Sequence, residues 1–100
     1  MSSEINDRIL IQATEYWGVI SRYEMLQEEC MELAMAVHKI LNRNDRNGTQ
    51  MDDLCDEIAD VRIVLRSIEL CSPELNEKIA ERIDFKMGRL VQRLENHEPH

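Results

Sequence analysis

The chain has 100 residues, 43% of them hydrophobic and 4% aromatic, and it carries a formal net charge of −8. This length predicts one domain spanning residues 1–100, and the scarcity of Gly and Pro beside abundant Leu, Ile, Met, Ala, Glu and Arg favours helices. The acidic charge argues against a nucleic-acid partner, whose phosphates attract basic surfaces. No apolar run exceeds five residues, whereas a membrane-spanning helix needs about 20.

The first two helices are expected close together near the amino terminus. Apolar residues at helical spacing predict a helix over 4–16, with Ser2 or Ser3 as its cap. Gly18 breaks that pattern, and a longer helix is predicted over 20–43.

Turn-forming residues then mark a loop, NDRNGTQ, at 44–50. Thr49 and Asp52 resemble a capping box that opens a third helix, which is expected to reach about Leu70.

The fourth helix is expected directly after the third. Ser72 is its predicted cap, because Pro73 is favoured in a first helical turn. The helix is expected to reach about Glu95, and residues 95–100 are expected to form a frayed tail. The predicted fold class is therefore an all-α bundle.

The three cysteines bear on the compartment. Their number is odd and none forms a CxxC pair, which favours reduced thiols in a cytoplasmic protein over a disulfide framework. The start of the chain, MSSEINDRI, lacks the basic and apolar segments of a secretory signal. Cys30 falls on an apolar stripe, so we expect it to be buried as a small hydrophobe.

One pattern occurs twice, in LQEECMELAMAVHKI (26–40) and in LCDEIADVRIVLRSI (54–68). Each segment combines an apolar stripe with carboxylates at and beyond its edge. The expected stripes are Leu26, Cys30, Leu33, Val37 and Ile40, and Leu54, Ile58, Val61, Leu65 and Ile68. The carboxylates are Glu28, Glu29 and Glu32, and Asp56, Glu57 and Asp60. The short loop makes the two helices antiparallel neighbours, so the carboxylates are expected to meet near the middle of the hairpin.

Such a meeting is electrostatically unfavourable. Like charges ~4 Å apart repel by ~4 kcal/mol near a protein surface, so the carboxylates must take up protons or bind cations. An all-oxygen ligand set selects Mg²⁺, with Mn²⁺ as a substitute. The sequence contains no Glu-x-x-His, no HExxH, no EF-hand loop and no phosphate-binding glycine loop. The alternative is that the carboxylates are solvated faces of ordinary amphipathic helices.

EECMEL (28–33), followed after a loop by DEIADV (56–61), resembles the ExxE…ExxD signature of the MazG-like all-α nucleoside triphosphate pyrophosphohydrolases. That family is related to the all-α dimeric dUTPases and the phosphoribosyl-ATP pyrophosphohydrolases. The resemblance extends from YWG (16–18) through the fourth helix. It implies a four-helix MazG-like bundle whose central antiparallel helix hairpin carries the acidic site.

The resemblance also implies a ligand set and a reaction. Glu29, Glu32, Glu57 and Asp60 would bind Mg²⁺, and the enzyme would cleave a nucleoside triphosphate into a monophosphate and pyrophosphate. Glu29 and Glu28 are the candidate catalytic residues, with Glu28 either the base for the attacking water or part of the outer shell. A homodimer or homotetramer is implied as well.

Basic residues are candidates for binding the phosphates. Lys86 interrupts the apolar stripe of the fourth helix, with Arg89 and Arg93 on one flank. Such a lysine either meets an anion or extends its aliphatic stem along the core to water. Lys39 projects from the same side of its helix as the carboxylates, and it either approaches a phosphate or pairs with a neighbouring acid.

Three other residues leave two interpretations open. Trp17 either stacks on a nucleobase or fills the core at the junction of the first two helices. Met31 and Met35 form a second apolar face on the second helix, which suggests that another subunit covers it. The alternative to an enzyme is therefore a non-catalytic, oligomeric helical adaptor.

Overall fold

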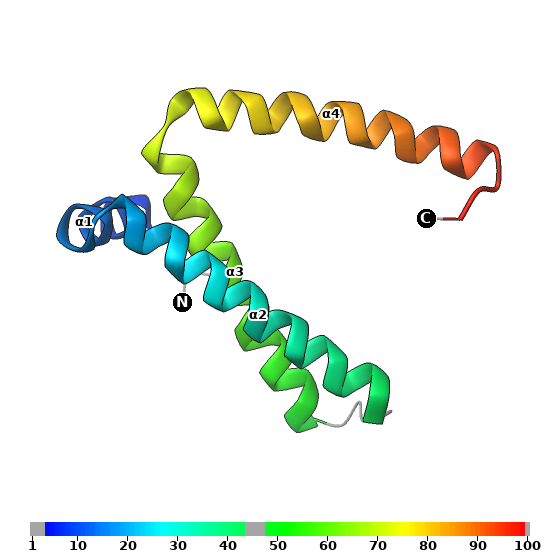
Figure 1. Ribbon diagram of the computed structural model, residues 1–100, viewed down its shortest axis with the longest axis horizontal. Helices are drawn as coiled ribbons and strands as arrows, with labels where there is room; N and C mark the ends of the chain where they lie inside the picture. Colours follow the sequence, from blue (N-terminus) through cyan, green and yellow to red (C-terminus); the bar gives the residue numbers. More distant parts are fainter. Residues whose placement is uncertain (1–3, 44–47, 100) are drawn as a thin grey trace.

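The computed structural model describes residues 4–43 and 48–99, and all regular structure in that part of the chain is helical (Figure 1). The helices are α1 (Asp7–Trp17), α2 (Val19–Arg43), α3 (Gly48–Cys71) and α4 (Pro73–Glu95). Within these residues, the predicted all-α class and the four predicted helices are confirmed. Among the described residues, no helix is both long enough and apolar enough to cross a membrane.

Helix α1 begins later than predicted, because Asn6 provides its cap. The side-chain oxygen of Asn6 accepts hydrogen bonds from the backbone N–H groups of Arg8 (3.0 Å) and Ile9 (3.3 Å). The predicted cap at Ser2 or Ser3, which lie outside the described residues, is therefore wrong. Gly18, at φ 91°, ends the helix as predicted.

Helices α2 and α3 pack along their length as an antiparallel hairpin (Figure 1). Their packed residues recur at alternating spacings of three and four, as in a coiled-coil seam. In α2 the seam comprises Leu26, Glu29, Leu33, Ala36 and Ile40, and in α3 it comprises Leu54, Glu57, Val61, Val64 and Ile68.

The predicted apolar stripes were therefore partly wrong. Cys30, which we expected to be buried, is exposed, and so are Val37, Ile58 and Leu65. Apolar residues occur on both sides of α2, and packing selects the side that contains the small residue Ala36. Because neighbouring residues lie about 100° apart around a helix, packing through the Ala36 side turns the buried face of α2 away from Cys30 and toward Glu29.

The start of α3 also differs from the prediction. The helix begins at Gly48, so Thr49 is already inside its first turn and does not cap it. The expected capping box with Asp52 is therefore wrong. Residues 44–47 of the predicted loop lie outside the described part of the chain.

Helix α1 lies against α3 and is held there by an ion pair. The Arg66 guanidinium donates two hydrogen bonds to Asp7, from Nε to Oδ1 (2.9 Å) and from Nη2 to Oδ2 (2.8 Å). Leu10 is the buried residue of α1. Ser67 is buried in α3, where its hydroxyl donates a hydrogen bond to the Ile63 carbonyl (3.3 Å).

Helix α4 leaves the rest of the molecule at an angle. As predicted, the Ser72 hydroxyl accepts a hydrogen bond from the Leu75 N–H (3.2 Å), with Pro73 in the first turn. Of the other three helices, α4 contacts only α3 (Figure 1). The expected four-helix bundle is thus not closed within one chain, because the single residue between α3 and α4 is too short to reverse the chain.

Candidate metal centre

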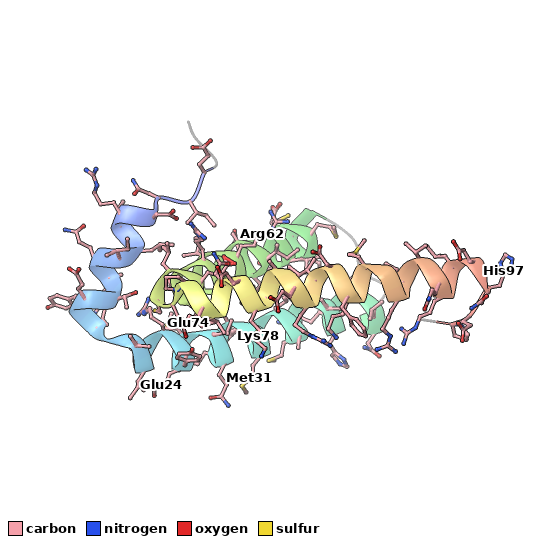
Figure 2. All side chains as sticks on the ribbon, turned by 90° about the horizontal axis from the view of Figure 1, so that it is seen from above. Glu24, Met31, Arg62, Glu74, Lys78 and His97 are labelled. Carbon is pink, nitrogen blue, oxygen red and sulfur yellow. The ribbon has the colours of Figure 1, made fainter. Side chains whose placement is uncertain are left out.

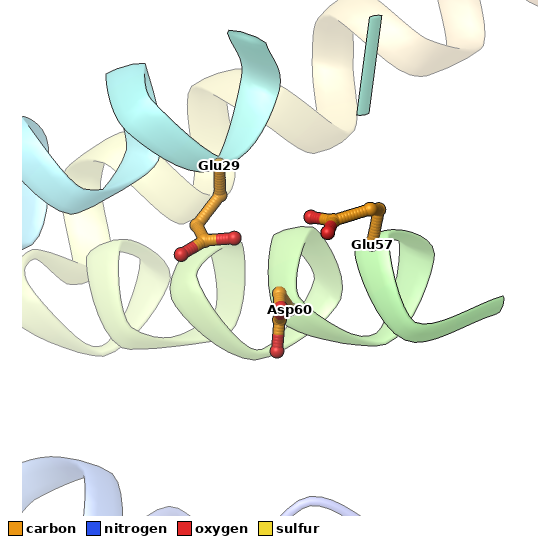
Figure 3. Close-up of side chains that lie close together, drawn as sticks. All are labelled: Glu29, Glu57 and Asp60. Atoms are coloured by element: carbon orange, nitrogen blue, oxygen red, sulfur yellow. The ribbon is translucent and has the colours of Figure 1, made fainter. Parts of the chain in front are cut away.

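Three carboxylates from two helices converge at the middle of the α2–α3 hairpin. Glu29 extends from α2 toward α3, where it approaches Glu57 and Asp60 (Figure 3). One carboxylate oxygen from each residue lies within 4.8 Å of the other two. Glu29 and Glu57 are half-buried because they occupy seam positions, whereas Asp60 is exposed beside them.

The environment disfavours ionisation of the two seam glutamates. Burial raises the pKa of Glu29, and the negative charges of Asp60, Glu57 and Glu32 raise it further. Burial also raises the pKa of Glu57, again with contributions from Glu32 and Asp60. Within the part of the chain that the structure describes, none of these carboxylates forms an ion pair with Lys or Arg. The cluster therefore favours either protonation or a bound cation.

One oxygen in the cluster lacks any hydrogen bond. Oε2 of Glu57 is buried from solvent and has no hydrogen-bond partner among the described residues. A buried, unsatisfied polar atom is destabilising, and such atoms are uncommon in native proteins. A hard cation prefers oxygen ligands of this kind, and Mg²⁺ commonly uses one or two carboxylates and completes its shell with water. The donor set therefore fits Mg²⁺.

Of the other two predicted carboxylates, Glu32 lies near this cluster, whereas Glu28 is not among the charges that act on Glu29 or Glu57. Glu32 is exposed and outside the set of three, but it is close enough for its charge to raise the pKa values of Glu29 and Glu57. Glu28 is exposed on α2 and lines a pocket at the junction of α1 and α2.

Asp53 was not predicted as part of this region. Its charge, with that of Asp56, also raises the pKa of Glu57. The signal that could have identified it is its position four residues before Glu57, on the same face of α3.

A pocket of about 440 Å³ lies at the junction of α1 and α2. It is lined by Trp17, Ser21, Arg22, Glu24, Met25 and Glu28. The Trp17 side chain does not fill the core, since it is 60% exposed. The guanidinium carbon of Arg22 lies 5.3 Å from the Trp17 ring centroid, a distance typical of cation–π contact.

The predicted phosphate-binding residues are not brought to the carboxylates within one chain. Lys86, Arg89 and Arg93 line a shallow pocket of about 290 Å³ with Leu90 on α4, and α4 makes no contact with α2. Lys39 is exposed on α2 ten residues beyond Glu29, which corresponds to about 15 Å along the helix.

Another pocket was not anticipated from the sequence. It encloses about 620 Å³ between residues 4–10 and α3. Its walls are mainly apolar, and they include Ile5, Ile9, Ile58 and Ile63.

Comparison of the chain with known protein families, with curated proteins and with solved structures finds no match in any of the three.

Proposed function

We propose that this protein is a Mg²⁺-dependent nucleoside triphosphate pyrophosphohydrolase of the MazG-like type. It would convert a ribo- or deoxynucleoside triphosphate and water into the monophosphate and pyrophosphate. The observation that carries the proposal is the convergence of Glu29, Glu57 and Asp60 in the hairpin, with one buried Glu57 oxygen lacking a partner. The reaction itself is suggested by the resemblance of EECMEL and DEIADV to the family signature.

In this proposal Glu29, Glu57 and Asp60 would hold the metal, and Glu32 would complete the acidic site from the next turn of α2. The bound ion would neutralise charge on the phosphates and lower the pKa of the attacking water. Glu28 is the candidate base, because it is an exposed carboxylate next to Glu29 in the chain and would accept the proton of that water. Manganese would substitute for magnesium, since both prefer oxygen ligands.

The pocket lined by Trp17 and Glu28 is the proposed position of the nucleobase. The exposed face of Trp17 offers a stacking surface, and Glu28, which precedes Glu29 in the chain, lines the same pocket. A nucleotide whose base rested on Trp17 would thus direct its phosphates toward Glu29.

The test is to incubate the protein and Mg²⁺ with a panel of ribo- and deoxynucleoside triphosphates and to separate the products. We expect pyrophosphate and a monophosphate from at least one substrate. Release of orthophosphate and a diphosphate would contradict cleavage between the α and β phosphates. Loss of turnover on chelation, with recovery on adding Mn²⁺, would support the metal assignment.

The second candidate is a non-catalytic, oligomeric helical adaptor. The exposure of Met31 and Met35, at 63% and 59%, favours this alternative, as does the long helix α4, which contacts only α3. Thermal unfolding with and without Mg²⁺ distinguishes the two. A ligand that binds only the folded state stabilises it by ~2.7 kcal/mol at 100 times its dissociation constant, whereas an adaptor should respond only to ionic screening.

A further inference from the structure

Helix α4 presents an apolar face that no described part of the chain covers. Only its first two turns approach α3, with Leu75 and Ile79 half-buried. Beyond them Ile83, Leu90 and Leu94 remain 54%, 42% and 68% exposed. Viewed from above, α4 lies in front of α2 and α3 and carries side chains along both of its edges (Figure 2). Most of the stability of a helix comes from packing its apolar face, so this helix needs a partner.

The exposed area is consistent with a second copy of the chain as that partner. The chain exposes 8366 Å², whereas a compact monomer of 11.8 kDa would expose about 5,900 Å². Its radius of gyration is 16.7 Å, against about 13 Å for a compact 100-residue domain. The excess is roughly 2,500 Å² per chain, and burying it in a dimer would give an interface in the obligate range of about 2,000–5,000 Å².

The charges on α4 restrict how two copies can pair. Basic residues follow one flank of its apolar stripe, whereas acidic residues lie on the opposite side of the helix, beyond Met87 and Val91. The basic flank comprises Arg82, Lys86, Arg89 and Arg93, and the opposite side carries Glu77, Glu81, Asp84 and Glu95. If two α4 helices packed antiparallel through their stripes, the two basic flanks would face each other. This repulsion disfavours a symmetric antiparallel α4–α4 contact.

Helix α2 carries the complementary pattern. On its outer side, the exposed apolar residues Met31 and Met35 adjoin the exposed carboxylates Glu28 and Glu32. An apolar strip bordered by acids on α2 thus matches an apolar strip bordered by bases on α4. In the described part of the chain, Lys86 forms no ion pair or hydrogen bond, so its charge is available to a second molecule.

We propose that α4 of each chain packs on the outer face of α2 in a second copy, in a closed, reciprocal dimer. Its apolar stripe covers Met31 and Met35, and Lys86 and Arg89 lie beside Glu28 and Glu32 of that copy. The basic side chains of the second copy then complete the acidic site. The site's own chain cannot supply them, because α4 makes no contact with α2 in the same chain. The proposed role of Lys86 and Arg89 toward phosphates rests on the function proposed above, whereas the docking does not.

Docking is tested without any activity assay. Unlabelled and ¹⁵N-labelled wild-type protein are mixed, allowed to exchange, and treated with a carbodiimide, which joins amines to carboxylates in direct contact. We expect light scattering to give twice the 11.8 kDa chain mass, and mass spectrometry to find links from Lys86 to Glu28 or Glu32 that join a labelled to an unlabelled peptide. A monomeric mass, links only between peptides of the same label, links only from Lys86 to a second α4, or no link to α2 would each overturn the proposal.

Completion of the site is tested by mixing two inactive variants. The Glu57→Gln variant has a disabled acidic site but keeps the basic side chains of α4. The Lys86→Ala, Arg89→Ala double variant keeps the acidic site but lacks those basic side chains. In a reciprocal dimer half of the molecules would be mixed, and each would contain one intact site, so about a quarter of wild-type activity should return. No recovery, despite confirmed mixing, would place both groups in one chain. If the wild type hydrolyses no nucleotide, the proposed function fails, and the cross-links still decide the docking.

Discussion

Replacing Glu29 by Gln should stabilise the metal-free protein. The substitution keeps the size of the side chain but removes one of three negative charges whose oxygens lie within 4.8 Å of one another. Two unit charges at that separation repel by about 1 kcal/mol in water and about 3.5 kcal/mol at the effective dielectric of a protein surface. Because Asp60 is exposed, we take the lower figure, and ~1 kcal/mol corresponds to a rise of about 4–8 °C in the Tm of a domain of this size.

The assay is differential scanning calorimetry at pH 7 and one protein concentration, with EDTA or with saturating Mg²⁺. We expect the variant to melt higher than the wild type in EDTA and to lose most of the Mg²⁺-induced rise. Glu15→Gln on α1 is the matched control, since it removes the same charge from an exposed position outside the cluster. An unchanged Tm in EDTA together with a full response to Mg²⁺ would show that Glu29 is only part of a solvated surface.

Three further predictions concern the cluster, the core and the pocket. The pKa values of Glu29 and Glu57 are raised above 4.5, so the stability they contribute is full below that pH and is lost as the pH rises through the raised values. The Tm in EDTA should therefore increase from pH 7 toward pH 5. A Tm that does not change with pH would contradict the clustering of the carboxylates. Ile68→Ala in the buried seam should lower the free energy of unfolding, measured in urea, by about 2–5 kcal/mol. Ile63→Ala is the control, since Ile63 is 41% exposed. If Ile68→Ala lost no more stability than the control, the result would be evidence against the seam. Trp17→Ala should raise the KM for the nucleotide with little change in kcat or Tm, and an unchanged KM would remove Trp17 from the base pocket.

The sequence was sufficient to predict the helices and the meeting of the carboxylates. Helical periodicity, the break at Gly18 and the Ser72 cap are local signals, and local signals determine where helices begin and end. The meeting of Glu29 with Glu57 followed from two similar helices joined by a short loop.

Features that depend on packing between helices were not predictable in the same way. Cys30 and Val37 are as apolar as Ala36, and only the packed hairpin shows that the seam passes through Ala36 and leaves the other two exposed. The predicted ligand set grouped Glu32 with the seam glutamates, although Glu32 lies outside the three-carboxylate cluster. The direction of α4 depends on the geometry of one residue, Ser72, and no periodic pattern encodes it.

The most direct test of the central claim is turnover in H₂¹⁸O with Mg²⁺, followed by mass spectrometry of the separated products. If water attacks the α-phosphorus at the carboxylate cluster, the label should appear in the nucleoside monophosphate, with none in pyrophosphate. Asp60→Asn should abolish most of that incorporation while the helical content stays unchanged. Label in pyrophosphate or orthophosphate would contradict attack on the α-phosphorus, and undiminished incorporation by Asp60→Asn would contradict the assignment of the site.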